Sequence, residues 1–354
     1  MKNILYRLST YILAIALIVF LEIGVYSMVN RVYRTIAGTK FYGREREVRE
    51  LLKLIENGCY TILWGPRNVG KSELARYVSW LLSKKGWFIN HIDIRSYLSE
   101  KKISVYGGVD RDSFLETISS LLGLPEGLLR IFDYGVRFVK EKRCHGLLWV
   151  VDEPHLLPSP RVFLEALIKK TLYTFHEKTV SVVITVSDGW FVLSDTIDSL
   201  LGYGAIPLFI DWLDPGSYRM FIEEIQIVYN KEIDIDSTLL YNEYTGGVPG
   251  ALVSLIRDGL NRWIDSTYRQ FINGIKRIHK RTNYSLIEIL EAIEKLPQRI
   301  NTLTIDRETE LIDELVRENI AFYNIMEKQP LVKPQLPIYK KHAVNTIKEL
   351  KTKK

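Results

Sequence analysis

Eight consecutive residues carry the clearest chemistry in the chain, Gly65-Pro66-Arg67-Asn68-Val69-Gly70-Lys71-Ser72. They match G-x-x-x-x-G-K-[ST], the pattern of a phosphate-binding loop, without a mismatch. The two glycines let the backbone wrap tightly, so that its N–H groups point inward at phosphate oxygens. Lys71 is expected to reach the β- and γ-phosphates, and the Ser72 hydroxyl is expected to ligate Mg²⁺. A chance glycine-rich turn is the alternative interpretation.

The flanks of this loop supply the structural context that it needs. Tyr60–Trp64 is a short apolar run typical of a buried strand. Apolar residues then recur at helical spacing over 71–85, which predicts a helix whose positive end faces the phosphates. Glu73, the residue after the motif, is included with the loop in the expected nucleotide site.

A second motif, which is acidic, follows about 80 residues later, where Gly146–Val151 leads into Asp152 and Glu153. A continuous apolar run predicts a central parallel strand that is buried on both faces. A carboxylate at the end of such a strand can hold Mg²⁺, which assigns Asp152 to the metal. Its neighbour Glu153 can polarise an attacking water molecule as a general base.

Further apolar runs predict the rest of an α/β sheet. The expected strands are Trp87–Asp93, Val180–Asp188 and Ala205–Ile210, and the stretch 96–110 is expected to be a surface loop. Helical patterns lie between the strands, at Asp112–Leu122, Glu126–Lys142 and Pro160–His176. Strands that alternate with helices favour a parallel sheet with right-handed connections.

Composition places the chain among ordinary globular proteins of two or three domains. It has 354 residues, of which 47% are hydrophobic and 25% are charged, and a formal net charge of +6. Its two cysteines, Cys59 and Cys144, form neither a disulfide framework nor a zinc site. A reducing compartment is therefore expected.

The N-terminal segment Tyr11–Val29 contains one ionisable side chain, that of Glu22. A helix of this length measures roughly 28 Å, enough to cross a hydrocarbon core of about 30 Å. A single membrane span is the favoured interpretation. A cleaved signal peptide and a buried or interfacial helix are the alternatives, and export would separate a nucleotide site from ATP.

Flanking charge predicts the orientation of this span. Two basic residues precede it and five follow soon after, at Arg31, Arg34, Lys40, Arg44 and Arg46. Because the more positive flank stays in the cytoplasm, the body is expected on the cytoplasmic face.

The segment Phe41-Tyr42-Gly43-Arg44-Glu45, its following helix 45–57 and the phosphate-binding loop resemble the archaeal ATPase family, in the STAND branch of AAA+-like P-loop proteins. The resemblance implies ATP and Mg²⁺ as cofactors and the strand order 5-1-4-3-2. It places Phe41, Tyr42 and Arg44 beside the base and ribose, although Phe41 is equally suited to packing. It also implies a γ-phosphate sensor after the fourth strand. Ser187 is the preferred candidate, with Thr185 and Asp188 as alternatives.

With that strand order, the two cysteines would precede strands separated by one other strand. Two strand spacings amount to about 10 Å, which is too far for a disulfide. Both thiols are therefore expected to be free.

A segment with two glycines and a proline, Gly246-Gly247-Val248-Pro249, resembles the lid motif of the same family. It follows a predicted helix at 217–229. Proline suits a helix start because its missing N–H costs nothing there. The resemblance places Pro249 near the adenine and ribose, and the alternative is a simple turn between helices.

The last part of the chain resembles a winged-helix domain. Helices are predicted near 286–293 and 306–319, and wing strands at Ala321–Ile325 and Pro337–His342. The helix 306–319 would be the recognition helix, but it carries six acidic residues against two arginines. Phosphates repel such a helix, so a protein contact is favoured over DNA. The basic residues lie instead at 276–281, 340–341 and 348–354. They could contact DNA backbone or an anionic lipid surface, and a solvated tail is the favoured interpretation.

These observations lead to four expected parts: a transmembrane anchor (1–30), a P-loop domain (31–210), a helical lid (211–281) and a winged-helix-like domain (282–354). The expected function is a membrane-anchored, Mg²⁺-dependent ATPase that acts as a switch or remodeller, with a protein partner or a second copy. The alternatives are a membrane-tethered DNA-handling ATPase and a nucleotide-binding scaffold with little turnover. Neither Arg67 nor Arg161 is assigned as an arginine finger, so slow hydrolysis is expected. His155 is interpreted as a polar loop residue.

Overall fold

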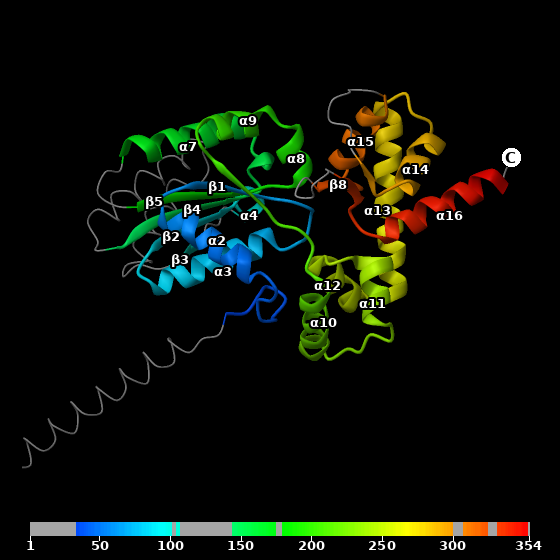
Figure 1. The fold of residues 1–354 in the computed structure, drawn as a ribbon, viewed down its shortest axis with the longest axis horizontal. Helices are drawn as coiled ribbons and strands as arrows, with labels where there is room; N and C mark the ends of the chain where they lie inside the picture. The colour runs from blue at the N-terminus through cyan, green and yellow to red at the C-terminus, as the bar shows by residue number, and fades with distance from the viewer. Residues whose placement is uncertain are drawn as a thin grey trace, which may run out of the picture.

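The computed structural model describes residues 33–100, 104–106, 144–174, 179–299, 307–324 and 331–352. Its largest sheet has the strand order β3-β2-β4-β5-β1-β6 (Figure 1). The strands are Tyr60–Trp64 (β1), Phe88–Asp93 (β2), Ser104–Tyr106 (β3), Gly146–Asp152 (β4), Thr179–Thr185 (β5) and Ile206–Phe209 (β6). All neighbours are parallel except β3, which pairs antiparallel with β2. The five parallel strands confirm the predicted order 5-1-4-3-2.

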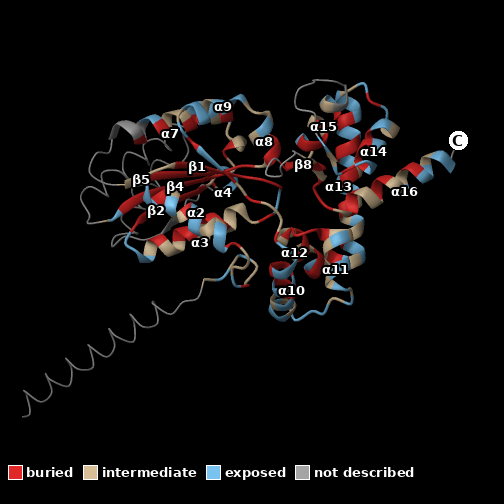
Figure 2. Ribbon diagram, in the orientation of Figure 1, coloured by how far each residue is buried: buried red, intermediate tan, exposed pale blue. Residues whose placement is uncertain are grey.

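Helices cover both faces of this sheet. Glu45–Glu56 (α2) and Lys71–Lys84 (α3) lie on one face, and Pro160–Thr174 (α7) and Asp195–Gly202 (α9) lie on the other (Figure 1). Alternation along β4 explains both layers, because Leu148 packs in the cluster that contains α3, whereas Leu147 packs in the cluster that contains α7. The strands β1, β2, β4 and β5 are consequently almost fully buried (Figure 2), whereas the edge strand β6 is partly exposed.

The structure corrects the prediction of a loop over 96–110. Ile94–Glu100 forms a short helix (α4), and β3 follows as a sixth strand on the outer edge of β2. A strand of three residues carries too little periodicity to be read from sequence. The predicted helices at 112–122 and 126–142 lie outside the described residues.

The fourth predicted strand is also shorter than expected. β5 ends at Thr185, because Ser187 is the extended N-cap of a helix that begins at Asp188 (α8, Asp188–Leu193). The carboxyl end of the sheet is therefore followed directly by a helix N-terminus at the site where the sensor was predicted.

Four helical segments and one π-helix follow the sheet. They are Pro215–Tyr229 (α10), Ser237–Leu239 (α11), the π-helix Leu240–Thr245 (η2), Pro249–Asp258 (α12) and Leu260–Arg281 (α13). Asp214 caps α10 by accepting hydrogen bonds from the backbone N–H groups of Gly216 and Ser217. Pro249 occupies the first turn of α12, as the sequence predicts for a proline at a helix start.

The C-terminal part combines helices with a small sheet of order β7-β9-β8. Its elements are Leu286–Glu294 (α14), Gln298–Arg299 (β7), Arg307–Arg317 (α15), Ala321–Asn324 (β8), Leu331–Pro334 (β9) and Ile338–Thr352 (α16). The predicted wing strand Pro337–His342 is wrong, because β9 forms earlier and residue 338 begins α16. Buried residues at helical spacing, Ile338, Ala343 and Ile347 among them, explain the helix. The predicted solvated tail is helical as far as Thr352.

Part of the acidic cluster of this region pairs with part of its basic cluster. Arg281 of α13 lies 2.7 Å from Glu314 and 2.8 Å from Glu318, and Arg277 lies 2.6 Å from Glu318. The acidic side of α15 thus packs against α13. Within the described residues, these two arginines therefore form ion pairs between two helical parts of the same chain.

No helix among the described ranges is long and apolar enough to cross a bilayer. The predicted span Tyr11–Val29 lies outside those ranges. Cys59 and Cys144 are free thiols, as expected.

Candidate functional site

The phosphate-binding loop connects β1 to α3 in a strained, tightly wound conformation. Gly65 has φ 139°, and a Cβ at this position would lie 2.2 Å from the carbonyl oxygen of Ile210. Only glycine fits there. Asn68 has a positive φ of 64°, and such backbone strain is characteristic of ligand-binding loops. The loop lines a cavity of about 730 Å³.

Lys71 extends into this loop and donates hydrogen bonds to the carbonyl oxygens of Gly65 (2.9 Å) and Pro66 (2.7 Å). Burial lowers the pKa of Lys71 to about 8, and the negative charge of Asp188 is the largest opposing influence. Asp188 is fully buried, and burial raises its pKa to about 7. The charges of Lys71 and the buried Asp188 are therefore electrostatically linked beside the phosphate-binding loop.

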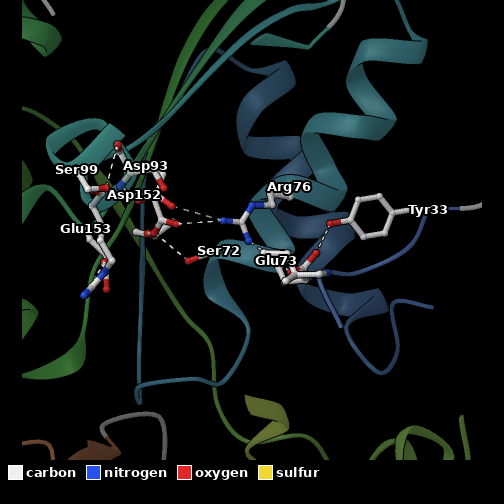
Figure 3. Close-up of polar contacts among 12 residues, drawn as sticks. Tyr33, Ser72, Glu73, Arg76, Asp93, Ser99, Asp152 and Glu153 are labelled. Carbon is white, nitrogen blue, oxygen red and sulfur yellow. Dashed lines mark hydrogen bonds and ion pairs between the residues drawn. The ribbon is translucent and has the colours of Figure 1, made fainter. Parts of the chain in front are cut away.

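Ser72 and Asp152 meet at the expected metal position. The Ser72 hydroxyl donates a 2.9 Å hydrogen bond to Oδ1 of Asp152 (Figure 3). The Thr185 hydroxyl donates to the same oxygen. Hydroxyl and carboxylate oxygens suit Mg²⁺, which usually takes one or two protein ligands together with phosphates and water. The described residues contain no cluster of three or more His, Cys, Asp or Glu that would hold a metal alone. The residues present thus fit Mg²⁺ bound jointly with a nucleotide.

Glu153 adopts an unusual backbone conformation, with φ 56° and ψ 49°. Its carboxylate lies 2.9 Å from the guanidinium of Arg95, which follows β2 on α4. Left-handed backbone geometry costs energy in a residue other than glycine. Sequence reasoning missed Arg95, although its position two residues after the end of β2, beside β4, could have indicated it.

The three sensor candidates are brought to one edge of the sheet but differ in their surroundings. Ser187 lines the cavity, and its side chain caps no N–H of α8. Thr185 belongs to the metal end through its bond to Asp152. Asp188 is linked to Lys71, and the backbone N–H of Tyr323 also lowers its pKa. The sensor role of Ser187 stays a prediction.

The residues predicted beside the base and ribose all line the cavity: Phe41, Tyr42, Arg44 and Pro249. Phe41 stacks on Tyr77 with ring centroids 4.6 Å apart. The Arg44 guanidinium donates hydrogen bonds to the backbone carbonyl oxygens of Val69 (3.1 Å) and Asp211 (2.6 Å). Arg44 therefore fastens the phosphate-binding loop in this structure.

Two parts of the chain distant in sequence also contact that loop. The backbone N–H of Gly250 on α12 donates to the carbonyl oxygen of Asn68 (3.1 Å). The side-chain amide of Gln335 donates to the backbone carbonyl oxygen of Arg67 (2.9 Å). Gln335 is 4% exposed. Asn319, which follows α15, lines the same cavity. Neither Gln335 nor Asn319 belongs to a recognisable motif, so sequence reasoning did not find them.

Three other residues named in the sequence analysis, His155, Arg67 and Arg161, differ in their positions relative to the cavity. His155 lines the cavity, and burial lowers its pKa. Arg67 also lines the cavity. Arg161 lies on the exposed side of α7, 2.8 Å from Glu165.

A family model described as an ATPase domain predominantly from Archaea matches residues 41–255. Among solved structures, a Walker-type ATPase of Pyrococcus abyssi superposes with a TM-score of 0.58 at 18% identity, covering 88% of this chain and 99% of that one. The ORC2 protein of Aeropyrum pernix, solved with ADPNP and ADP, gives a TM-score of 0.49 at 13% identity, with 91% and 98% covered. No curated protein matches the chain.

Proposed function

This chain belongs to the family of ATPase domains found predominantly in Archaea, and on that basis we propose that it is an Mg²⁺-dependent ATPase that acts as a conformational switch or remodeller. The observation that carries the proposal is the contact between Ser72 and Asp152 at 2.9 Å. It places a hydroxyl and a carboxylate next to the phosphate-binding loop. The family and the P-loop fold imply ATP binding and hydrolysis.

Each residue of the site has a defined part in nucleotide binding. The loop N–H groups and Lys71 bind phosphate oxygens, and Lys71 exchanges its bonds to the loop carbonyls for bonds to phosphate. Ser72 and Asp152 would hold Mg²⁺, which supplies charge neutralisation at the β- and γ-phosphates. Phe41, Tyr42 and Pro249 line the side of the cavity that we assign to the base.

Hydrolysis requires a base near the γ-phosphate, and Glu153 is the candidate. In the structure its carboxylate is held by Arg95 at 2.9 Å. We assign slow intrinsic turnover to this state, because the ion pair orients the Glu153 carboxylate toward Arg95 and not toward an attacking water molecule. Release of Glu153 from Arg95 would then accompany activation.

The switch is supported by the contacts that converge on the phosphate-binding loop. Gly250 on α12 and Gln335 in the C-terminal part each donate a hydrogen bond to a loop carbonyl. Phosphates that change the loop conformation would change both contacts at once. A bound nucleotide can shift an equilibrium only through such differential contacts.

We further propose that the predicted span Tyr11–Val29 anchors this switch at a membrane, with the body on the cytoplasmic face. The apolar length of that segment and the basic residues after it support this placement. A protease added outside intact cells would leave the body undigested. Digestion of the body would refute the orientation.

Two substitutions test the ATPase itself. Lys71→Ala is expected to abolish nucleotide binding, and Glu153→Gln is expected to preserve binding while blocking turnover, both measured with a fluorescent ATP analogue and phosphate release. Normal hydrolysis by the Glu153 variant would refute the mechanism.

A nucleotide-binding scaffold with little turnover is the second candidate, and the Arg95–Glu153 ion pair favours it. Phosphate release that stays at background while nucleotide binds would support it. A DNA-handling ATPase is a weaker candidate, because Arg277 and Arg281, which could contact phosphates, are paired with Glu314 and Glu318 inside the chain.

A further inference from the structure

The segment just after the predicted span is connected to the metal end of the nucleotide site by three side chains. The Tyr33 hydroxyl donates to the Glu73 carboxylate, and Glu73 lies 3.5 Å from the guanidinium of Arg76 (Figure 3). That guanidinium lies 4.0 Å from Oδ2 of Asp152 and 3.9 Å from Oδ2 of Asp93. Tyr33 itself follows Val29 by only four residues.

The surroundings of Tyr33 hold it firmly against α3. Its ring contacts those of Tyr77 (centroids 5.1 Å apart), Trp80 (5.7 Å) and Phe41 (6.4 Å). The backbone N–H of Ile36 also donates to Glu73, at 3.5 Å. The segment that begins at Tyr33 is therefore bound to Glu73 at two points.

Arg76 is a further cation at the metal end of this site. It lies one helical turn after Ser72 on α3, and it faces the carboxylate oxygen of Asp152 that Ser72 does not contact. Mg²⁺ held by Ser72 and Asp152 would lie close to this guanidinium, and two cations at such a distance repel each other. The position of Arg76 must therefore affect how tightly the metal binds.

Glu73 offers Arg76 an alternative partner. While Tyr33 and Ile36 hold the Glu73 carboxylate, the guanidinium is shared among three acidic groups and does not close on Asp152. If the Glu73 carboxylate loses its hydrogen bonds from Tyr33 and Ile36 and turns toward solvent, Arg76 retains only Asp93 and Asp152 as acidic partners. The guanidinium would then approach Asp152 and compete with Mg²⁺ for its charge.

We propose that Tyr33 and Glu73 are positioning residues that hold Arg76 away from Asp152 and thereby set the Mg²⁺ affinity of the site. The inference rests on the proposed ATPase function and adds a route by which the N-terminal segment acts on it. A displacement of the segment that enters at Tyr33 would lower Mg²⁺ affinity, which couples the predicted anchor to the nucleotide site.

The test is an Mg²⁺ titration of the full-length chain in mild detergent with a fluorescent ATP analogue, read as nucleotide binding and not as turnover. Tyr33→Phe removes the hydroxyl but keeps the ring. We expect it to raise the Mg²⁺ concentration for half-maximal effect by roughly fivefold. Nucleotide affinity in EDTA should stay unchanged, because the phosphate-binding loop is intact.

Tyr77→Phe is the matched control, because Tyr77 lies in the same aromatic cluster and its hydroxyl makes no hydrogen bond to the described residues. It should leave the titration unchanged. Arg76→Met removes the competing cation, so Tyr33→Phe should have no further effect in an Arg76→Met background.

Two results would overturn the inference: equal Mg²⁺ titrations for wild type and Tyr33→Phe, or equal losses with Mg²⁺ and with EDTA. The second result would indicate a packing defect. If the wild-type chain binds no nucleotide under either condition, the proposed function fails instead, so the two failures are distinguishable.

Discussion

Arg95 and Glu153 form an ion pair of 2.9 Å at the edge of the nucleotide cavity, between a helix that follows β2 and the loop that follows β4. The backbone of Glu153 is left-handed. The acidic residue expected to activate water is therefore held by both its backbone and a cation. In this state the P-loop and the metal-side residues are arranged for binding, whereas the base is engaged elsewhere.

Arg95→Gln is expected to increase basal ATP turnover by about threefold, because it frees the Glu153 carboxylate from a partly exposed ion pair. Nucleotide affinity should not change, since Arg95 contacts no residue of the phosphate-binding loop. Steady-state phosphate release and analogue binding measure the two quantities. A fall in turnover to the level of Glu153→Gln would mean that Arg95 orients the base for catalysis.

Nucleotide affinity should fall as pH rises above about 8. Burial lowers the pKa of Lys71 to about 8, so the empty site loses this positive charge in that range. Bound phosphates favour the charged form, so binding above pH 8 requires proton uptake and weakens by up to tenfold per pH unit. Titrations of the ATP analogue between pH 7 and 9.5 measure the effect.

Lys71→Arg is the control for this pH dependence, because arginine stays charged over the whole range. Its affinity is expected to be lower at pH 7 but nearly flat up to pH 9.5. A wild-type profile equally flat would contradict a lowered pKa for Lys71.

The sequence predicted the parallel sheet because most of its strands are nearly continuous apolar runs, and because the phosphate-binding loop specifies both its strand and its helix. Shorter elements could not be predicted from the sequence. β3 has three residues, and β9 ends in Pro334, which reads as a turn signal. The segment 337–342 carries a proline that is equally compatible with a strand start and a helix start, and only packing against α14 and α13 decides for the helix.

The candidate site divides in the same way. The proximity of Ser72 to Asp152 could be predicted because each residue belongs to a recognisable motif. Arg95, Arg76 and Gln335 could not, because each reaches the site through tertiary contacts from an unmarked position. The isolated sequence also gives no indication that Arg44 and Glu73 bind other parts of the protein.

Asp188→Asn should change the pH dependence of stability in a defined direction. Burial raises the pKa of Asp188 to about 7 from its ordinary value of 3.8. The folded state therefore binds a proton that the unfolded state has released between pH 4 and 7, and stability falls as pH rises through that window. The asparagine variant lacks this loss, so its stability relative to wild type should increase from pH 4 to 7.

Thermal unfolding of both proteins at pH 4.5, 5.5 and 7 measures this difference. The charge of Lys71 opposes the shift, so Lys71→Met should enlarge the pH dependence in the wild-type Asp188 background. A constant difference between Asp188→Asn and wild type across the three values would contradict a raised pKa.

Gln335→Ala tests whether the C-terminal part reports on the phosphate-binding loop. The Gln335 amide is nearly buried and donates a 2.9 Å hydrogen bond to the Arg67 carbonyl oxygen. Its removal leaves that carbonyl without this partner and weakens the docking by about 1–3 kcal/mol. We expect nucleotide release to accelerate about fivefold or more, measured by stopped-flow displacement of a fluorescent ADP analogue. Lys348→Ala, on the exposed end of α16, is the matched control and should release nucleotide at the wild-type rate. Equal release from both variants would mean that the C-terminal part rests on the loop without affecting it, and the switch would then depend on α12 and its Gly250–Asn68 contact alone.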